Sequence, residues 1–233
     1  MSKEEFVLNI ALGKVNVEIG YPVIAQWVIM VIIIAAVLIT VRGFKSVPHG
    51  KQVWVEILYE NVRNLVGDNM GEEYMNFIPF AGTLMIYMLP LNLTGLFGFK
   101  PPTTDYSVTL GMALISFIVI NVVSIRRAGI LGYVKGYTKP YAFMLPINLI
   151  ERLIVPVSLS LRLFGNMLAG TIIVDLIYRA LAYFSSLLKL KIPMLQLIIP
   201  IPFHVYFDIF DGVVQMIIFT MLTMIFIKTT SEH

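Results

Sequence analysis

The sequence predicts an all-α membrane protein with about five membrane crossings, a surface amphipathic helix, and a C-terminal hairpin of two long, strongly tilted helices. The composition is the first indication, because 58% of the 233 residues are hydrophobic and only 13% are charged, whereas soluble domains carry about 25% charged residues. The second is a set of apolar runs close to the length of about 20 residues that a helix needs to cross a bilayer. The third is a pair of helical runs near the C-terminus that are too long for upright spans. We expect residues 1–233 to form a single membrane domain.

The first part of the chain is expected to hold one span and one surface helix. Residues 1–19 are predicted to be an N-terminal segment outside the membrane, and residues 20–76 to contain the first span and the surface helix. No charge interrupts the run from Pro22 to Val41, which therefore fits one crossing. From Val53 to Met75 charged and apolar residues are mixed, which is typical of an amphipathic helix on the cytoplasmic surface.

Residues 77–139 are expected to contain the second and third spans. The second span runs from Phe77 to about Phe97, and Pro90 near its end predicts a kink or an early stop. The third span runs from Ser107 to about Ile125. We expect the arginine pair Arg126–Arg127 to end it.

Residues 140–233 are expected to form a long helical hairpin that carries an ion path. Its arms are the helical runs Pro140–Phe184 and Met194–Ile227, and Lys189–Pro193 breaks the pattern between them. A helix of about forty residues is about 60 Å long, twice the thickness of the hydrocarbon core. Both arms must therefore tilt strongly or lie nearly flat in the membrane.

Charge and composition also limit the function. The net charge of +3 fits basic cytoplasmic loops, and we expect no nucleic-acid partner. The predicted inside segments hold nine basic residues and the outside segments five, so an outside N-terminus and a cytoplasmic C-terminus are favoured. The chain has no cysteine and no phosphate-binding glycine loop. We expect no cofactor, no metal and no catalytic residue, and residues 1–18 do not read as a cleavable signal peptide.

Arg162 is the most informative residue, because it lies inside the apolar segment Ser158–Gly170. A guanidinium stays charged at physiological pH, and burying it at bilayer depth costs about 2.5 kcal/mol or more. Such a charge usually marks an ion or substrate path. The alternative is a structural ion pair with Asp175 or Glu151.

Helical spacing groups the other polar residues into two sets. Steps of 7, 4, 4 and 3 place five residues of the first arm on one helix face: Glu151, Ser158, Arg162, Asn166 and Ala169. Gly165 and Gly170 flank that face and let another helix approach, although ordinary small-residue packing also explains Ala169 and Gly170. Steps of 4, 3 and 4 form the polar stripe of the second arm: His204, Asp208, Asp211 and Gln215.

The polar stripe suits a hydrated path for protons or small cations, because carboxylates and imidazole exchange protons. A metal site is an alternative for the stripe, and a structural histidine is an alternative for His204. Asp175 and Arg179 lie at positions i and i+4, where they most simply pair with each other. From the hairpin register we expect Arg162 and Gln215 to lie side by side at similar depth, within direct or single-water contact, and to face the same surface.

The segment Ser158–Gly170 is similar to the hallmark of subunit a of F-type ATP synthases, the membrane stator of the rotary motor. The similarity extends to Pro146–Glu151, Leu91–Leu93 and Gln215–Thr223, and covers about residues 20–229. The family fold, with a surface helix and two long tilted helices, agrees with the elements expected above.

The resemblance implies an ion-translocating stator subunit that is not itself catalytic. It would provide two offset half-channels to a rotating c-ring and couple proton or sodium flow to ATP synthesis. The implied partners are the c-ring, the subunit b peripheral stalk and the lipid bilayer, in a bacterial cell membrane. The alternative is a secondary ion-coupled transporter with an intramembrane charge relay, but such folds often contain repeats and none is visible here. A purely structural scaffold does not explain Arg162 and the polar stripe together.

The resemblance also implies roles for single residues. Arg162 would separate the half-channels, Gln215 matches a glutamine that faces this arginine, and Asn166 matches an asparagine one turn beyond it. Asn92 matches a polar residue of the half-channel that opens to the outside. Asp208 falls where relatives have histidine or an acidic group, and Thr171 where some have glutamate or histidine. We therefore expect Asp208 and Asp211 to supply the acid that Thr171 lacks.

Overall fold

The structure, a computed structural model, describes residues 8–12, 15–42, 44–45, 49–136, 143, 145–187 and 194–231. Within these residues, five helices are long and apolar enough to cross a membrane. The predicted all-α membrane class is therefore confirmed. A small antiparallel hairpin of β1 (Leu8–Leu12) and β2 (Val15–Ile19) precedes the helices. We did not predict it, although Val15, Val17 and Ile19 alternate with polar residues as in a strand.

The first span and the surface helix occur where the sequence predicts helices. Helix α1 (Tyr21–Val41) coincides with the first span to within one residue and buries none of its side chains. The surface segment is divided into α2 (Lys51–Met70) and the short 3₁₀ helix η1 (Glu72–Phe77). Gly71 separates them with a φ of 96°, a conformation that glycine adopts without strain.

The next two spans differ in how well their ends were predicted. Helix α3 (Ile78–Leu93) ends three residues after Pro90 and continues as the 3₁₀ helix η2 (Thr94–Phe97), so the expected early stop is confirmed. The 3₁₀ helix η3 (Pro102–Thr104) leads into α4 (Tyr106–Gly136).

The third helix extends past Arg126–Arg127, the pair that is expected to end the third membrane span. Helix α4 continues through the pair and breaks only at Gly129, whose φ is 71°. A charged pair ends an apolar run without ending a helix, because arginine favours helical conformation.

The C-terminal hairpin has one continuous arm and one segmented arm. Helix α5 (Leu145–Leu187) has 43 residues, a length of about 65 Å. The second arm is a long helical run, as expected for Met194–Ile227, and it is divided into four consecutive segments: α6 (Met194–Ile198), α7 (Pro200–His204), the π-helical segment η5 (Val205–Asp211) and α8 (Gly212–Ser231). Prolines at 200 and 202 remove backbone donors there. The expected start at Pro140 and the break Lys189–Pro193 lie outside the described residues.

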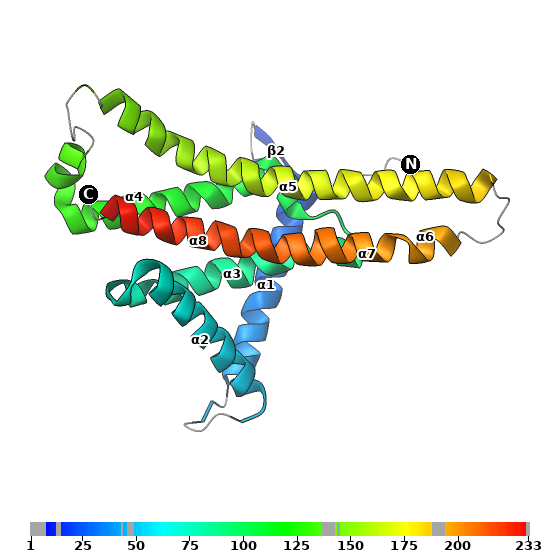
Figure 1. Cartoon of the computed structure of the whole chain (residues 1–233), viewed down its shortest axis with the longest axis horizontal. Helices are drawn as coiled ribbons and strands as arrows, with labels where there is room; N and C mark the ends of the chain where they lie inside the picture. The colour runs from blue at the N-terminus through cyan, green and yellow to red at the C-terminus, as the bar shows by residue number, and fades with distance from the viewer. Residues whose placement is uncertain are drawn as a thin grey trace.

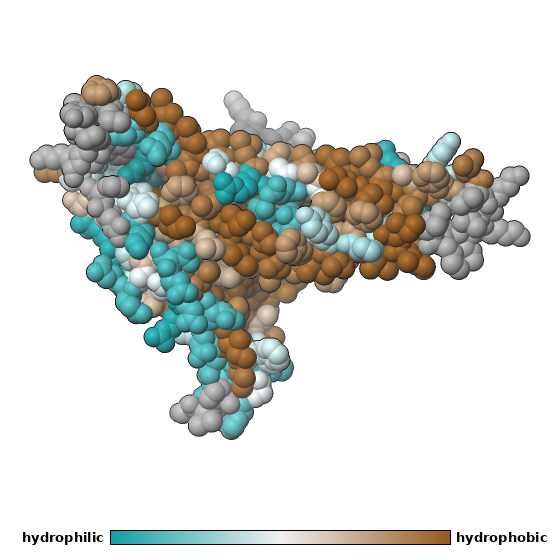
Figure 2. Space-filling model, viewed as in Figure 1, coloured by the Kyte–Doolittle hydropathy of each residue, from teal (hydrophilic) through white to brown (hydrophobic). Residues whose placement is uncertain are grey.

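The two arms run antiparallel and side by side, with α3 and α4 packed against them, whereas α1 crosses at a steep angle (Figure 1). One apolar core lies between α3, α4, α5 and α8, and contains Met88, Leu91, Leu163, Met167 and Phe219. A second core joins α2, α3, α4 and the end of α8. Apolar side chains cover much of the hairpin surface, while hydrophilic ones gather over α2 (Figure 2).

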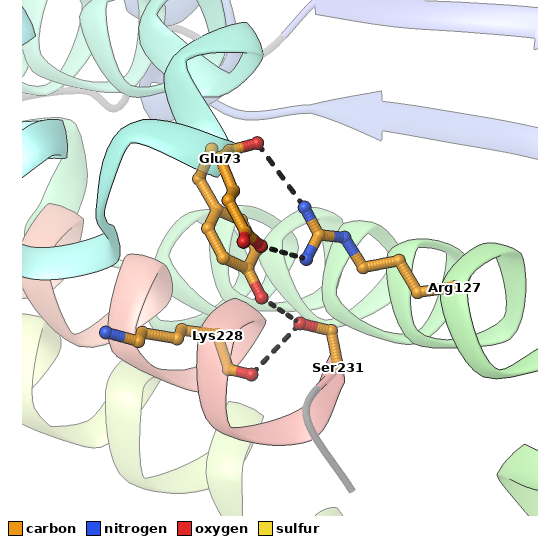
Figure 3. A network of polar contacts seen from close by, with 5 residues as sticks. Glu73, Arg127, Lys228 and Ser231 are labelled. Atoms are coloured by element: carbon orange, nitrogen blue, oxygen red, sulfur yellow. Dashed lines mark hydrogen bonds and ion pairs between the residues drawn. The ribbon is translucent and has the colours of Figure 1, made fainter.

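A polar network closes the second core at the end of α8 (Figure 3). The Arg127 guanidinium lies 3.9 Å from the centre of the Tyr74 ring, and its Nη1 is 3.8 Å from Glu73 Oε2. The Tyr74 hydroxyl lies 2.7 Å from Ser231 Oγ, which also donates to the carbonyl oxygen of Lys228. This end network ties η1 and α4 to the last turn of α8.

Candidate functional site

One face of α5 is exposed along the predicted line of small and polar residues. All five residues expected to share this face are exposed: Glu151, Ser158, Arg162, Asn166 and Ala169. The opposite face is buried through Leu159, Leu163 and Met167. Exposed apolar side chains surround the polar line, such as Leu161 at 50% and Ile154 at 55% exposure. The shared face is confirmed, and the described part of the chain leaves it uncovered.

Arg162 stands on this face with neither a hydrogen bond nor an ion pair to any described residue. Asp175 is engaged elsewhere, because its Oδ2 lies 2.8 Å from both Nε and Nη2 of Arg179. The predicted Asp175–Arg179 pair is therefore confirmed. Glu151 precedes Arg162 by eleven residues, about 16 Å along the helix axis. Neither carboxylate neutralises Arg162, so the alternative of a structural ion pair finds no support.

A second set of polar side chains, buried or half-buried, lies between the hairpin arms and α3. We call Asn92, Tyr178, His204 and Asp208 the polar cluster. His204 Nδ1 lies 2.5 Å from Asp208 Oδ2, and His204 Nε2 lies 3.1 Å from the Tyr178 hydroxyl. Asp208 is only 7% exposed. Tyr178 comes from α5 and His204 from α7, so the cluster joins the two arms.

Glycine at position 95 makes room for the Asp208 carboxylate. A Cβ on Gly95 would lie 2.7 Å from Asp208 Oδ1 and 2.8 Å from its Cγ. Real Cβ atoms do not approach so closely, so any larger residue would push the carboxylate away. Gly95 thus belongs to the site although it carries no functional group, and sequence reasoning missed it.

Asn92 holds α3 to the beginning of α8. Its side chain is fully buried, and its Nδ2 donates a 3.0 Å hydrogen bond to the carbonyl oxygen of Gly212. Its Oδ1 is buried as well and has no hydrogen-bond partner among the described residues. Buried polar atoms are nearly always paired, so this oxygen marks a position where a hydrogen-bond donor such as water is favoured.

The polar stripe faces inward. Gln215 is 5% exposed, while His204 and Asp211 are half-buried. Asp211 interacts with Gln215 on the same helix. Arg162 is exposed and Gln215 is buried, so the expected shared surface is wrong, while their expected proximity stays a prediction. The expectation assumed a regular α-helix, whereas the π segment η5 has wider turns that shift the residues after it around the axis.

Tyr178 is the other residue of the candidate site that sequence reasoning missed. A tyrosine within an apolar helix gives no signal by itself, and its partner His204 is 26 residues away in the chain. The metal alternative lacks a ligand set, because no group of three or more metal-ligating side chains occurs in the part of the chain that the structure describes.

The family model described as "ATP synthase A chain" matches residues 23–228. The chain belongs to the ATP synthase A chain family. It is 32% identical to "ATP synthase subunit a, sodium ion specific" of Propionigenium modestum, over 96% of this chain and 78% of the relative. It is 34% identical to "ATP synthase subunit a" of Moorella thermoacetica, over 88% of each chain. It is 32% identical to the protein of that name in Trichlorobacter lovleyi, over 100% of this chain and 94% of the relative. Family membership and the five apolar helices identify a multi-pass membrane subunit of an ATP synthase.

Proposed function

We propose that the chain is the ion-translocating stator subunit of the membrane sector of an F-type ATP synthase. It offers two offset half-channels to the rotating c-ring and couples proton or sodium flow to ATP synthesis. The observation that carries this proposal is Arg162, a permanent charge that the described chain leaves exposed and unpaired on an apolar helix face. An uncompensated charge of this kind in a membrane segment indicates an ion path.

Arg162 acts as the fixed charge between the half-channels. A ring carboxylate that passes it is favoured in its ionised form, because an opposite charge nearby stabilises the charged state. The same positive charge repels a proton or sodium ion that would otherwise run directly from one half-channel to the other. Asn166 lies one turn beyond on the same exposed face, where its amide can contact the ring or water.

The polar cluster lines one half-channel, and the polar stripe extends it past Asp211 to Gln215. The buried, unpaired Oδ1 of Asn92 supports a hydrated path at this point. Glu151 and Asp175 lie on the exposed surface of α5 on either side of Arg162. They line the approaches to it, Asp175 as half of its ion pair with Arg179.

The surfaces suit three neighbours. The exposed face of α5 contacts the c-ring. The unburied helix α1 and the apolar outer surface contact lipid and the subunit b peripheral stalk. The chain is not catalytic by itself. It lies in a bacterial cell membrane with an outside N-terminus and a cytoplasmic C-terminus.

The assembled complex in sealed vesicles provides the test. ATP-driven ion pumping, measured with and without sodium, should require this chain together with a copurifying ring of small hairpin subunits. The relatives are ATP synthase subunits, so the secondary-transporter alternative is not favoured. Ion transport by the chain alone in liposomes, without a ring, would support that alternative and contradict the proposal.

A further inference from the structure

Three side chains form a hydrogen-bonded chain across the hairpin. The Tyr178 hydroxyl lies 3.1 Å from His204 Nε2, and His204 Nδ1 lies 2.5 Å from Asp208 Oδ2. The Tyr178 and His204 rings are 5.8 Å apart with an interplanar angle of 55°. Both ring nitrogens of His204 are therefore engaged, one by each arm of the hairpin.

The chemistry of these groups fixes how the imidazole is oriented. An ionised carboxylate only accepts hydrogen bonds, so Nδ1 carries the proton when Asp208 is ionised. Nε2 of the neutral ring is then an acceptor for the Tyr178 hydroxyl. When Nε2 is protonated, the same hydroxyl turns and accepts from it, since a phenol oxygen both donates and accepts. Tyr178 thus keeps its contact in both protonation states of His204.

We propose that Tyr178 is a positioning residue that holds His204 toward Asp208, and that His204 and Asp208 relay protons through the half-channel. The inference rests on the proposed function and identifies the proton as the ion that this half-channel carries. A proton that reaches Nε2 makes the imidazolium, and the Nδ1 proton then moves to the Asp208 carboxylate. The imidazolium and carboxylate become a neutral imidazole and a neutral carboxylic acid, so proton and charge balance. A half-channel lined by imidazole nitrogens suits protons, whereas a sodium ion requires several oxygen ligands.

The segments around the relay maintain its geometry. The carboxylate of Asp208 is packed against Gly95, where a Cβ would lie 2.7 Å from its Oδ1. Gln196 Nε2 donates a 3.3 Å hydrogen bond to the carbonyl oxygen of Tyr178, which ties the second arm to α5 beside the relay. With Asp208 fixed by packing, the orientation of His204 depends on the Tyr178 hydroxyl.

Tyr178→Phe is the direct test, because it removes the hydroxyl and keeps the ring. Passive proton flow through the membrane sector is measured in vesicles stripped of the catalytic sector, per assembled complex, in sodium-free buffer. We expect a decrease of about fivefold, the order that the loss of one hydrogen bond permits. Tyr183→Phe is the matched control on the same helix, where the side chain is 66% exposed, and it should leave the flow unchanged. An unchanged flow in Tyr178→Phe overturns the inference, as does a flow that requires added sodium.

A second measurement, in a complex that carries His204→Gln, distinguishes positioning of the imidazole from simple packing between the two arms. If Tyr178 acts through the imidazole, Tyr178→Phe has no further effect on the flow in a His204→Gln complex. An equal decrease in both backgrounds would mean that Tyr178 only holds the arms together, and would overturn the inference. Arg162→Ala in parallel tests the proposed function itself. If that variant loses coupled synthesis while Tyr178→Phe conducts normally, only the relay is refuted. If it keeps normal coupled synthesis, the stator role is refuted.

Discussion

The exposed face of α5 and the polar cluster differ in whether their charged groups have partners within the described chain. Arg162 and Asn166 are exposed among apolar side chains, and Arg162 has no partner in the described chain. Asp208 and His204 are bonded to each other, and Tyr178 completes the set from the other arm. A polar group in a membrane must be satisfied by something. The first region therefore fits the proposed contact with the c-ring, whereas His204 and Asp208 are satisfied within the described chain.

This contrast distinguishes the proposed c-ring interface from the proposed ion path inside the chain. A charge at an interface must remain available for a passing partner, so the chain leaves it unpaired. Groups that transfer protons must instead be held at hydrogen-bond distance from one another. Substitutions in the two regions should accordingly fail in different ways, with lost coupling in the first and slowed flow in the second.

Arg162→Ala should have the largest effect. We expect ion-coupled ATP synthesis to be lost while the complex still assembles, because the side chain makes no hydrogen bond or ion pair within the described chain. Arg162→Lys should also be severely impaired, since lysine lacks the planar fork and loses its proton more readily on burial. ATP synthesis in energised vesicles, together with the subunit content of the complex, checks both. Normal coupled synthesis in the alanine variant would remove the contrast drawn here.

The double substitution Asp208→Asn and Asp211→Asn should come next. We expect ion translocation to slow in both directions, by at least about a hundredfold if these groups exchange the proton as acids and bases, without uncoupling. Amides keep similar shape and polarity but cannot take up a proton. ATP-driven pumping and passive flow measure the two directions. A sharp rise in passive leak would instead place these residues in the barrier with Arg162.

Gly95→Ala should slow the flow less, by about threefold, because a hydrogen bond is distorted and not removed. The new Cβ would lie 2.7 Å from Asp208 Oδ1 and should push the carboxylate away from His204. Gly111→Ala is the control, since a Cβ there meets nothing within 4 Å. Equal flow in the two variants would indicate that the position of Asp208 is not critical.

Gly95 and Tyr178 also mark the limit of what the sequence predicts. The spans and the exposed face of α5 follow from apolar runs and from spacing along a regular helix, which are local properties. The inward orientation of Gln215 depends on the π segment before it, and the Tyr178–His204 contact depends on how two arms pack. The break at Gly129 is a local glycine signal that we did not use, because Arg126–Arg127 indicate only where the apolar run ends. Packing across elements, which has no pattern in a single sequence, accounts for the other errors.

Substitutions in the end network should have the smallest effect on proton flow, in contrast to substitutions in the polar cluster. Tyr74→Phe removes the hydroxyl that lies 2.7 Å from Ser231 Oγ but keeps the ring under the Arg127 guanidinium. We expect a loss of about 1 kcal/mol in stability, as for one buried hydrogen bond, and no change in proton flow per complex. Ser231→Ala should give a similar loss, and the double variant little more, because both remove the same bond. Thermal unfolding of the complex and passive flow measure the two quantities. If Tyr74→Phe slowed the flow as much as Gly95→Ala, the last turn of α8 would set the position of Asp208 along the helix axis, and the two regions could not be treated as independent.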